Sequence, residues 1–202
     1  DSFRLFCSGE NAMRRLWAVG LGTMAFSMGD ILLEPFGGEI LHFTVSETTY
    51  LTAGLALGGL VGFAWASKVL SQGADPFRMA SRGAWVGVPA FLAVLISAPI
   101  ASAELFTLGA VFIGFGAGLF GHGTLTATMN QAPAGQAGLA LGAWGAVQAS
   151  TAGVAMALGG IIRDLAAQFT ESSAAYSMVY GIEVLLLIAT LLVMHPLVKA
   201  KS

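Results

Sequence analysis

The chain has 202 residues, of which 56% are hydrophobic and only 10% are charged, whereas a soluble domain carries about 25% charged residues. This shortage of polar side chains and a mean hydropathy of +0.78 exclude an ordinary soluble surface and indicate a protein of the lipid bilayer. The net charge of −2 gives no indication of nucleic-acid binding, and the single cysteine, Cys7, excludes an internal disulfide and a cysteine-rich metal site.

The first 15 residues form a polar segment that is predicted to precede the membrane on its cytoplasmic side. This segment has no initiator methionine and no signal-peptide pattern, so we expect an internal start within a longer protein. A membrane-spanning helix needs about 20 mostly apolar residues. Residues 16–197 are predicted to form one bundle of six such helices, followed by a cytoplasmic tail at 198–202. The predicted helices are Leu16–Gly37, Tyr50–Leu70, Arg82–Pro99, Leu105–Met129, Gly138–Ile162 and Tyr176–Pro196.

Lysine and arginine are distributed unevenly between the two sides of this bundle. One side receives Arg163 alone, and the other receives eight basic residues: Arg4, Arg14, Arg15, Lys68, Arg78, Arg82, Lys199 and Lys201. Because loops rich in lysine and arginine stay in the cytoplasm, both termini and the loop Ser71–Ser81 are predicted to be cytoplasmic. The opposite side is acidic, with Glu39, Glu47, Glu104, Asp164 and Glu171.

Carboxylates also occur within the predicted spans. In the stretch GDILLEPFGGEIL, Asp30 and Glu34 share one helix face because they are four residues apart. Glu34 is expected near the membrane surface, whereas Asp30 is deeper and is expected to face protein or a polar cavity rather than lipid. Pro35 and the pair Gly37–Gly38 are expected to break or bend this helix. Asp30 and Glu183 either have a function or are protonated or hydrogen-bonded to a neighbouring helix.

Three stretches closely resemble the PucC/LhaA family of phototrophic bacteria: GTMAFSMGDILLEPFGGEIL (22–41), IGFGAGLFGHGTLTATM (113–129) and GLALGAWGAVQASTAGVAMALGGIIRDL (138–165). The resemblance implies an all-α membrane protein whose six transmembrane helices resemble one half, here the C-terminal half, of a major facilitator superfamily fold. In that arrangement the last helix of each half is peripheral. Glu183 is therefore expected to make a docking contact with a partner helix or a pigment.

The resemblance also implies a function. It suggests a membrane assembly factor that binds or delivers bacteriochlorophyll during assembly of light-harvesting antenna complexes in the bacterial inner (intracytoplasmic) membrane. The expected partners are antenna polypeptides, bacteriochlorophyll and the lipid bilayer, and not nucleic acid. The alternative is a proton-coupled secondary transporter of a small solute, in which Asp30 and Glu183 titrate. A purely structural subunit of a photosynthetic complex is a third possibility.

The fourth predicted span carries a stripe of residues spaced by four: Gly114, Gly118, His122 and Thr126. One interpretation is close helix packing through the glycines, with His122 hydrogen-bonded across the interface. The other, which depends on the resemblance for its ligand, is a pigment site. In that case the glycines leave a flat groove for the macrocycle, and the imidazole of His122 ligates its central Mg.

The fifth span carries Trp144 and Gln148, also four residues apart. By the helical rise, Trp144 and His122 are expected at one level of a cleft, where the indole either stacks on a pigment or anchors the membrane interface. Gln148 is deeper and is expected to form an interhelical hydrogen bond. The sequence has no Ser-His-acid order, phosphate-binding loop after a strand, or metal-ligand cluster, so it does not predict an enzyme.

Overall fold

The computed structural model describes residues 12–132 and 135–199. Within these ranges the chain is entirely helical and contains six helices long and apolar enough to cross a membrane. The first of these spans is interrupted and consists of α2 (Ala12–Ser27), the short 3-10 helix η1 (Asp30–Leu32) and α3 (Leu33–Ile40). The others are α4 (Val45–Ser71), α5 (Pro76–Ser97), α6 (Ala103–Asn130), α7 (Ala137–Ala166) and α8 (Ser172–Lys199). The predicted all-α class and six spans are confirmed.

The predicted terminal segments are only partly covered. Residues 12–15 of the pre-membrane segment already belong to α2, and residues 198–199 of the predicted tail belong to α8. The rest of both segments, including Cys7, lies outside the described residues.

Polar caps explain why the helices begin earlier than the apolar windows predicted. The Thr44 side chain accepts a hydrogen bond from the backbone N–H of Glu47, and the Glu47 carboxylate accepts one from the backbone N–H of Thr44 at 2.7 Å. This reciprocal capping box begins α4. Asp75 caps α5 by accepting from the backbone N–H of Arg78 at 2.9 Å, and Pro76 takes the first helical position.

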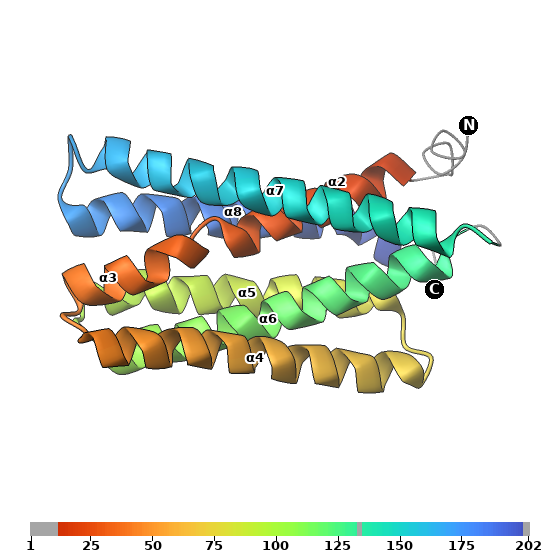
Figure 1. Cartoon of the computed structure of the whole chain (residues 1–202), viewed down its shortest axis with the longest axis horizontal. Helices are drawn as coiled ribbons and strands as arrows, with labels where there is room; N and C mark the ends of the chain where they lie inside the picture. Colours follow the sequence, from red (N-terminus) through yellow and green to blue (C-terminus); the bar gives the residue numbers. More distant parts are fainter. Residues whose placement is uncertain (1–11, 133–134, 200–202) are drawn as a thin grey trace.

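The helices run roughly along one direction, with α6 packed against both α4 and α5 (Figure 1). The helices α4 and α5 hardly contact each other. On the other side of the bundle α2 packs on α7 and α8, and α8 also packs on α5. Figure 1 places the beginning of α2, the end of α8 and the α4–α5 turn at one end of the molecule. We call this the basic end, because Arg14, Arg15, Lys68, Arg78 and Arg82 lie near it.

Glycines allow α4 and α6 to approach closely. A Cβ atom at Gly58 would lie 2.1 Å from the carbonyl oxygen of Val111, and one at Gly62 would lie 2.2 Å from that of Phe115. Both distances are far inside van der Waals contact, so only glycine permits this backbone-to-backbone packing. Small residues at such positions are the usual means by which membrane helices associate.

The interruption of the first span lies upstream of its predicted position. The helix α2 ends at Ser27, and Pro35, Gly37 and Gly38 all lie inside α3. A proline removes the hydrogen bond to the carbonyl four residues earlier and clashes with that carbonyl. For Pro35 the affected residue is Ile31, so the proline accounts for the departure from α-helical geometry within η1 but not for the end of α2 at Ser27. The prediction of a break was right, but its placement at Pro35 and the glycine pair was wrong.

At the opposite, acidic end, ionic contacts surround Arg163 of α7. Its guanidinium lies 4.0 Å from the Glu39 carboxylate of α3 and 3.0 Å from the carboxylate of Asp164. It also lies 4.9 Å from the ring centre of Tyr176 on α8. The one basic residue predicted for this side is therefore paired with acidic neighbours, so it adds little positive charge to that end.

The charge difference between the two ends predicts the orientation in the membrane. In a Cys7→Ser background, a cysteine at Gln72 in the α4–α5 turn is expected to react with an impermeant maleimide only from the cytoplasmic side. A cysteine at Glu171, at the acidic end, is the matched control and is expected to react only from the other side. Labelling of the Gln72 position from outside would show that the orientation is inverted.

Candidate functional site

Glu183 of α8 is fully buried, and its carboxylate lies at the interruption of the first span. The backbone N–H of Gly29 donates a hydrogen bond to Glu183 Oε1 at 2.6 Å, and the hydroxyl of Tyr180 lies 3.4 Å from the Gly29 carbonyl oxygen, to which it donates. A side chain at position 29 would lie 2.6 Å from the Tyr180 ring and 2.7 Å from Glu183 Oε2. Glycine is therefore required where α8 contacts the broken helix.

This placement corrects the expectation that Glu183 is a docking contact on a peripheral helix. The face of α8 that carries Glu183 packs against α2 and Gly29, so no partner can reach the carboxylate without opening the bundle. The alternative expectation, a hydrogen bond to a neighbouring helix, is the one that the structure supports. Glu183 Oε2 is buried and has no hydrogen-bond partner among the described residues.

Asp30 lines a cavity of about 260 Å³ between α2, α4, α6 and α7. Polar side chains from two helices share this cavity, namely Thr23 and Ser27 from α2 and Gln148 from α7. The position of Asp30 agrees with the expectation that it faces protein or a polar cavity. The interhelical hydrogen bond predicted for Gln148 is not formed within the described part of the chain. The Gln148 amide nitrogen instead points towards Gly121 of α6.

Glu34 lies on the exposed side of α3, one turn beyond Asp30. Its carboxylate accepts a hydrogen bond from the hydroxyl of Thr52 on α4. Asp30 and Glu34 therefore contact different surroundings: Asp30 lines the cavity, and Glu34 links α3 to α4.

The stripe on α6 packs directly on α4. A Cβ atom at Gly114 would lie 2.0 Å from the Leu55 carbonyl oxygen, and one at Gly118 would lie 2.3 Å from the Gly59 carbonyl oxygen. The backbone of α4 thus covers the Cβ side of both glycines, as the packing interpretation predicts. Both glycines also line the cavity of about 260 Å³ that contains Asp30, so the open space beside the stripe is this cavity and not a flat groove.

His122, one turn beyond Gly118, packs its imidazole against the ring of Phe63 at 4.1 Å between ring centres. Its Nδ1 atom is buried and has no hydrogen-bond partner among the described residues. The hydrogen bond predicted for His122 across the helix interface is therefore replaced by an aromatic contact. One ring nitrogen of His122 is left without a partner from the described part of the protein.

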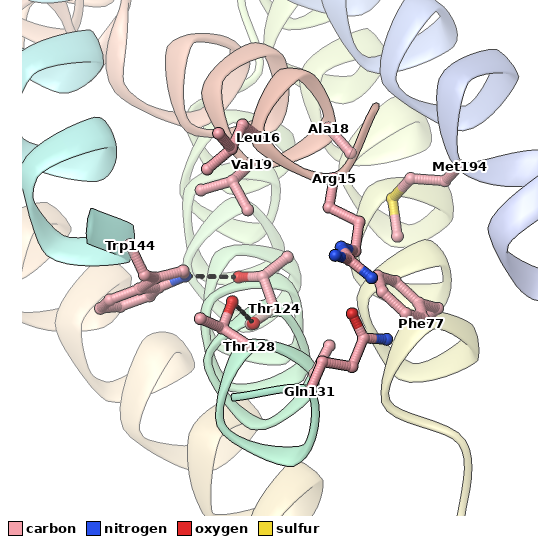
Figure 2. A pocket seen from close by; sticks show the side chains of 11 residues that line it. Arg15, Leu16, Ala18, Val19, Phe77, Thr124, Thr128, Gln131, Trp144 and Met194 are labelled. Carbon is pink, nitrogen blue, oxygen red and sulfur yellow. Dashed lines mark hydrogen bonds between the residues drawn. The ribbon is translucent and has the colours of Figure 1, made fainter. Parts of the chain in front are cut away.

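Trp144 contacts α6 on the face opposite to His122. Its indole N–H donates to the hydroxyl of Thr124 at 3.2 Å (Figure 2). Positions 122 and 124 are about 200° apart around a helix. Trp144 and His122 therefore share a level but line no common cleft, which corrects the expectation for this pair.

Trp144 instead lines a small pocket near the basic end, with a volume of about 20 Å³. Figure 2 shows the guanidinium of Arg15 and the amide of Gln131 pointing towards this pocket, beside the ring of Phe77. From the sequence, Arg15 was predicted only to be a cytoplasmic charge, and Gln131 was not predicted to belong to a site. The inward position of Arg15 could have been predicted from its spacing, because Arg15 lies on the same helix face as the apolar residues Ala18 and Val19, which are buried.

A model of the family described as "PUCC protein" matches residues 1–202. The chain belongs to this family. "Protein PucC" of Rhodovulum sulfidophilum is 58% identical over 164 residues, which cover 81% of this chain and 36% of that protein. "Protein PucC" of Cereibacter sphaeroides is 50% identical over 205 residues, which cover 99% of this chain and 45% of that protein. The "Bacteriochlorophyll synthase 44.5 kDa chain" of Rhodobacter capsulatus is 28% identical over 192 residues, which cover 90% of this chain and 44% of that protein.

The PucC relationship confirms the family resemblance seen in the sequence. The chain spans less than half the length of these PucC relatives. It is a membrane protein of the PucC family, with six candidate membrane-spanning helices in its described residues.

The contact between α4 and α6 predicts different outcomes for two glycines. Gly118→Ala places a methyl group against the backbone of α4, and such overpacking costs about 1–3 kcal/mol. It is expected to lower the thermal unfolding midpoint by several degrees. Gly145→Ala on α7 is the matched control, because nothing lies within 4 Å of a Cβ atom there. Equal thermal stability of the two variants, measured by fluorescence in detergent, would contradict the packing of α4 on this stripe.

Proposed function

We propose that this chain is part of a membrane assembly factor that binds or delivers bacteriochlorophyll while light-harvesting antenna complexes assemble. The observation that carries the proposal is the family match over all 202 residues. A more distant relative whose name refers to bacteriochlorophyll synthase supports the same context. The bacterial inner (intracytoplasmic) membrane is the proposed location, with both ends of this chain in the cytoplasm.

The residues present fit a bacteriochlorophyll only in part. The Nδ1 atom of His122 is buried without a partner among the described residues, so the other ring nitrogen of this half-buried side chain is the candidate ligand, and neutral imidazole is a common metal ligand. When bound, the pigment supplies a central Mg that accepts such a ligand. Gly114 and Gly118 pack on α4 and line the cavity of about 260 Å³ that contains Asp30. The pocket beside Trp144, at about 20 Å³, has room for about one water molecule.

Within this proposal His122 is therefore the pigment ligand, and the glycines hold α4 in place beside it. Phe63 lies edge-on to the imidazole and is 45% exposed, so it offers an apolar surface next to the ligand. Trp144 fixes α7 to α6 through Thr124 and takes no part in holding the pigment.

Antenna polypeptides are the proposed protein partners. Each is a single membrane helix, so contact takes place side by side within the bilayer. Exposed apolar residues on the outer faces of α4 and α7 suit such a contact, among them Leu57, Leu60 and Val61 on α4 and Val154, Leu158 and Ile161 on α7.

A proton-coupled transporter is the second candidate, and the cavity that contains Asp30 favours it. A carboxylate beside polar side chains in an intramembrane cavity is the usual setting of a proton relay. Glu183 does not add to this candidate, because its carboxylate is engaged by the Gly29 amide. Solute accumulation driven by a pH gradient would favour the transporter. A fixed stoichiometry in the mature antenna would instead favour a structural subunit.

The pigment proposal is tested by the absorption spectrum of the purified full-length protein that contains this chain. We expect bacteriochlorophyll to copurify with it, and we expect His122→Ala to lose at least about half of that pigment at unchanged thermal stability, because the proposed ligand is removed. His195→Ala is the matched control, since His195 is exposed near the end of α8.

Two results would count against this account in different ways. Unchanged pigment content in the His122 variant would reject His122 as the ligand while leaving the function intact. Wild-type protein without any pigment would reject the proposed function itself.

A further inference from the structure

A wide groove of about 830 Å³ lies on the side of the bundle formed by α4, α5 and α6. We call it the tryptophan groove, because Trp65 of α4 and Trp85 of α5 line it and are 60% and 64% exposed. Phe112 of α6 contributes a further exposed aromatic ring. The groove is separate from the cavity that contains Asp30, and His122 is not among its lining residues.

The groove follows from the way the three helices pack. Both α4 and α5 lie closely on α6 but have little contact with each other, so the surface of α6 between them is left uncovered. Small residues at the base of the groove, Ala90, Ala93 and Gly109, leave it hollow. The larger rings of Trp65, Trp85 and Phe112 form its sides. The groove therefore follows from the separation of α4 and α5 on the surface of α6.

Charge distinguishes this groove from an ordinary lipid-facing surface. Arg82 lines it and is the only charged residue that does so, and it forms no ion pair with any described residue. Trp65 lies six residues before the end of α4, and Arg82 lies six residues after the beginning of α5. Both are therefore about 9 Å from the basic end by the helical rise. Arg78 precedes Arg82 by one helical turn on the same face of α5.

A second groove between α4 and α6 provides a contrast at the acidic end. It encloses about 490 Å³, and its charged lining residues are Glu47 and Glu104. The two grooves therefore carry opposite charge, from Arg82 of α5 in the first and from Glu47 of α4 and Glu104 of α6 in the second. An anionic group is favoured beside Arg82 and disfavoured beside the two glutamates.

We propose that the tryptophan groove binds an anionic phospholipid, with its phosphate at Arg82 and its acyl chains along Pro89, Ala93 and Phe112. Basic pockets between membrane helices on the cytoplasmic side bind anionic headgroups, and tryptophan side chains prefer the level of the headgroups. A neutral pigment would fill the apolar part but leave the Arg82 guanidinium without a counter-charge. This inference is independent of the proposed function, because it uses neither His122 nor the family match.

Lipid titration followed by native mass spectrometry tests the proposal on the full-length protein. The probes are palmitoyl-oleoyl phosphatidylglycerol, which is anionic, and the phosphatidylcholine with the same acyl chains. We expect the wild-type protein to retain the anionic lipid about fivefold more strongly than phosphatidylcholine. This is the preference that the attraction of one basic residue near a headgroup produces. Arg82→Gln is expected to bring the two lipids within about twofold of each other.

Two further variants separate charge from shape. Arg14→Gln, at the same basic end but on α2, is the matched control and is expected to keep the preference for the anionic lipid. Trp85→Leu is expected to weaken retention of both lipids, because it removes part of the groove wall without changing charge.

Three results would overturn the proposal. The first is equal retention of the two lipids by the wild-type protein. The second is a preference that survives Arg82→Gln. The third is a wild-type protein that retains neither lipid, combined with a loss of thermal stability in Trp85→Leu. That combination would show that another part of the full-length protein covers the groove.

Discussion

A membrane helix has to satisfy its backbone hydrogen bonds within the protein, because the bilayer core contains no water to replace them. The first span of this chain departs from that pattern at Gly29. The Met28 amide still donates to the Met24 carbonyl oxygen at 3.0 Å, whereas the Gly29 amide donates to a side chain of another helix. The carboxylate of Glu183 supplies the missing acceptor for the Gly29 amide. An amide left buried without a partner costs about 1–3 kcal/mol, so the interruption is stable only while α8 remains packed against it.

Much of the rest of the arrangement depends on this contact. The interruption changes the direction of the chain, so that Asp30 lines the cavity between four helices while α3 reaches α4 through Glu34 and Thr52. It also fixes α8 against α2. The carboxylate of Glu183 thus has a structural task in this chain, which argues against a transporter that uses Glu183 as a titrating group. Asp30 remains the intramembrane carboxylate that is open to a cavity.

The sequence predicted the features that depend on local composition. The six spans follow from apolar windows of about 20 residues, and the two charged ends follow from the distribution of Lys and Arg. The caps Thr44 and Asp75 were not predicted, although they are also local, since each acts on the N–H three residues later. They extend α4 and α5 beyond the apolar windows.

The features that sequence reasoning misplaced depend on contacts between distant segments. Nothing near Gly29 in sequence indicates that Glu183, 154 residues later, accepts its hydrogen bond. The spacing of Gly114 and Gly118 fits a helix interface and a pigment groove equally well, and only the position of Leu55 and Gly59 decides between them. The tryptophan groove likewise arises from the separation of α4 and α5, which no single stretch of sequence specifies.

The most direct test of this account compares Glu183→Gln with Glu183→Leu in the full-length protein. Glutamine keeps an oxygen that accepts the Gly29 N–H, whereas leucine has a similar volume but no acceptor. We predict that the glutamine variant unfolds close to the wild-type temperature and that the leucine variant unfolds several degrees lower. A leucine variant as stable as the glutamine variant would contradict the claim that Glu183 stabilises the interrupted helix.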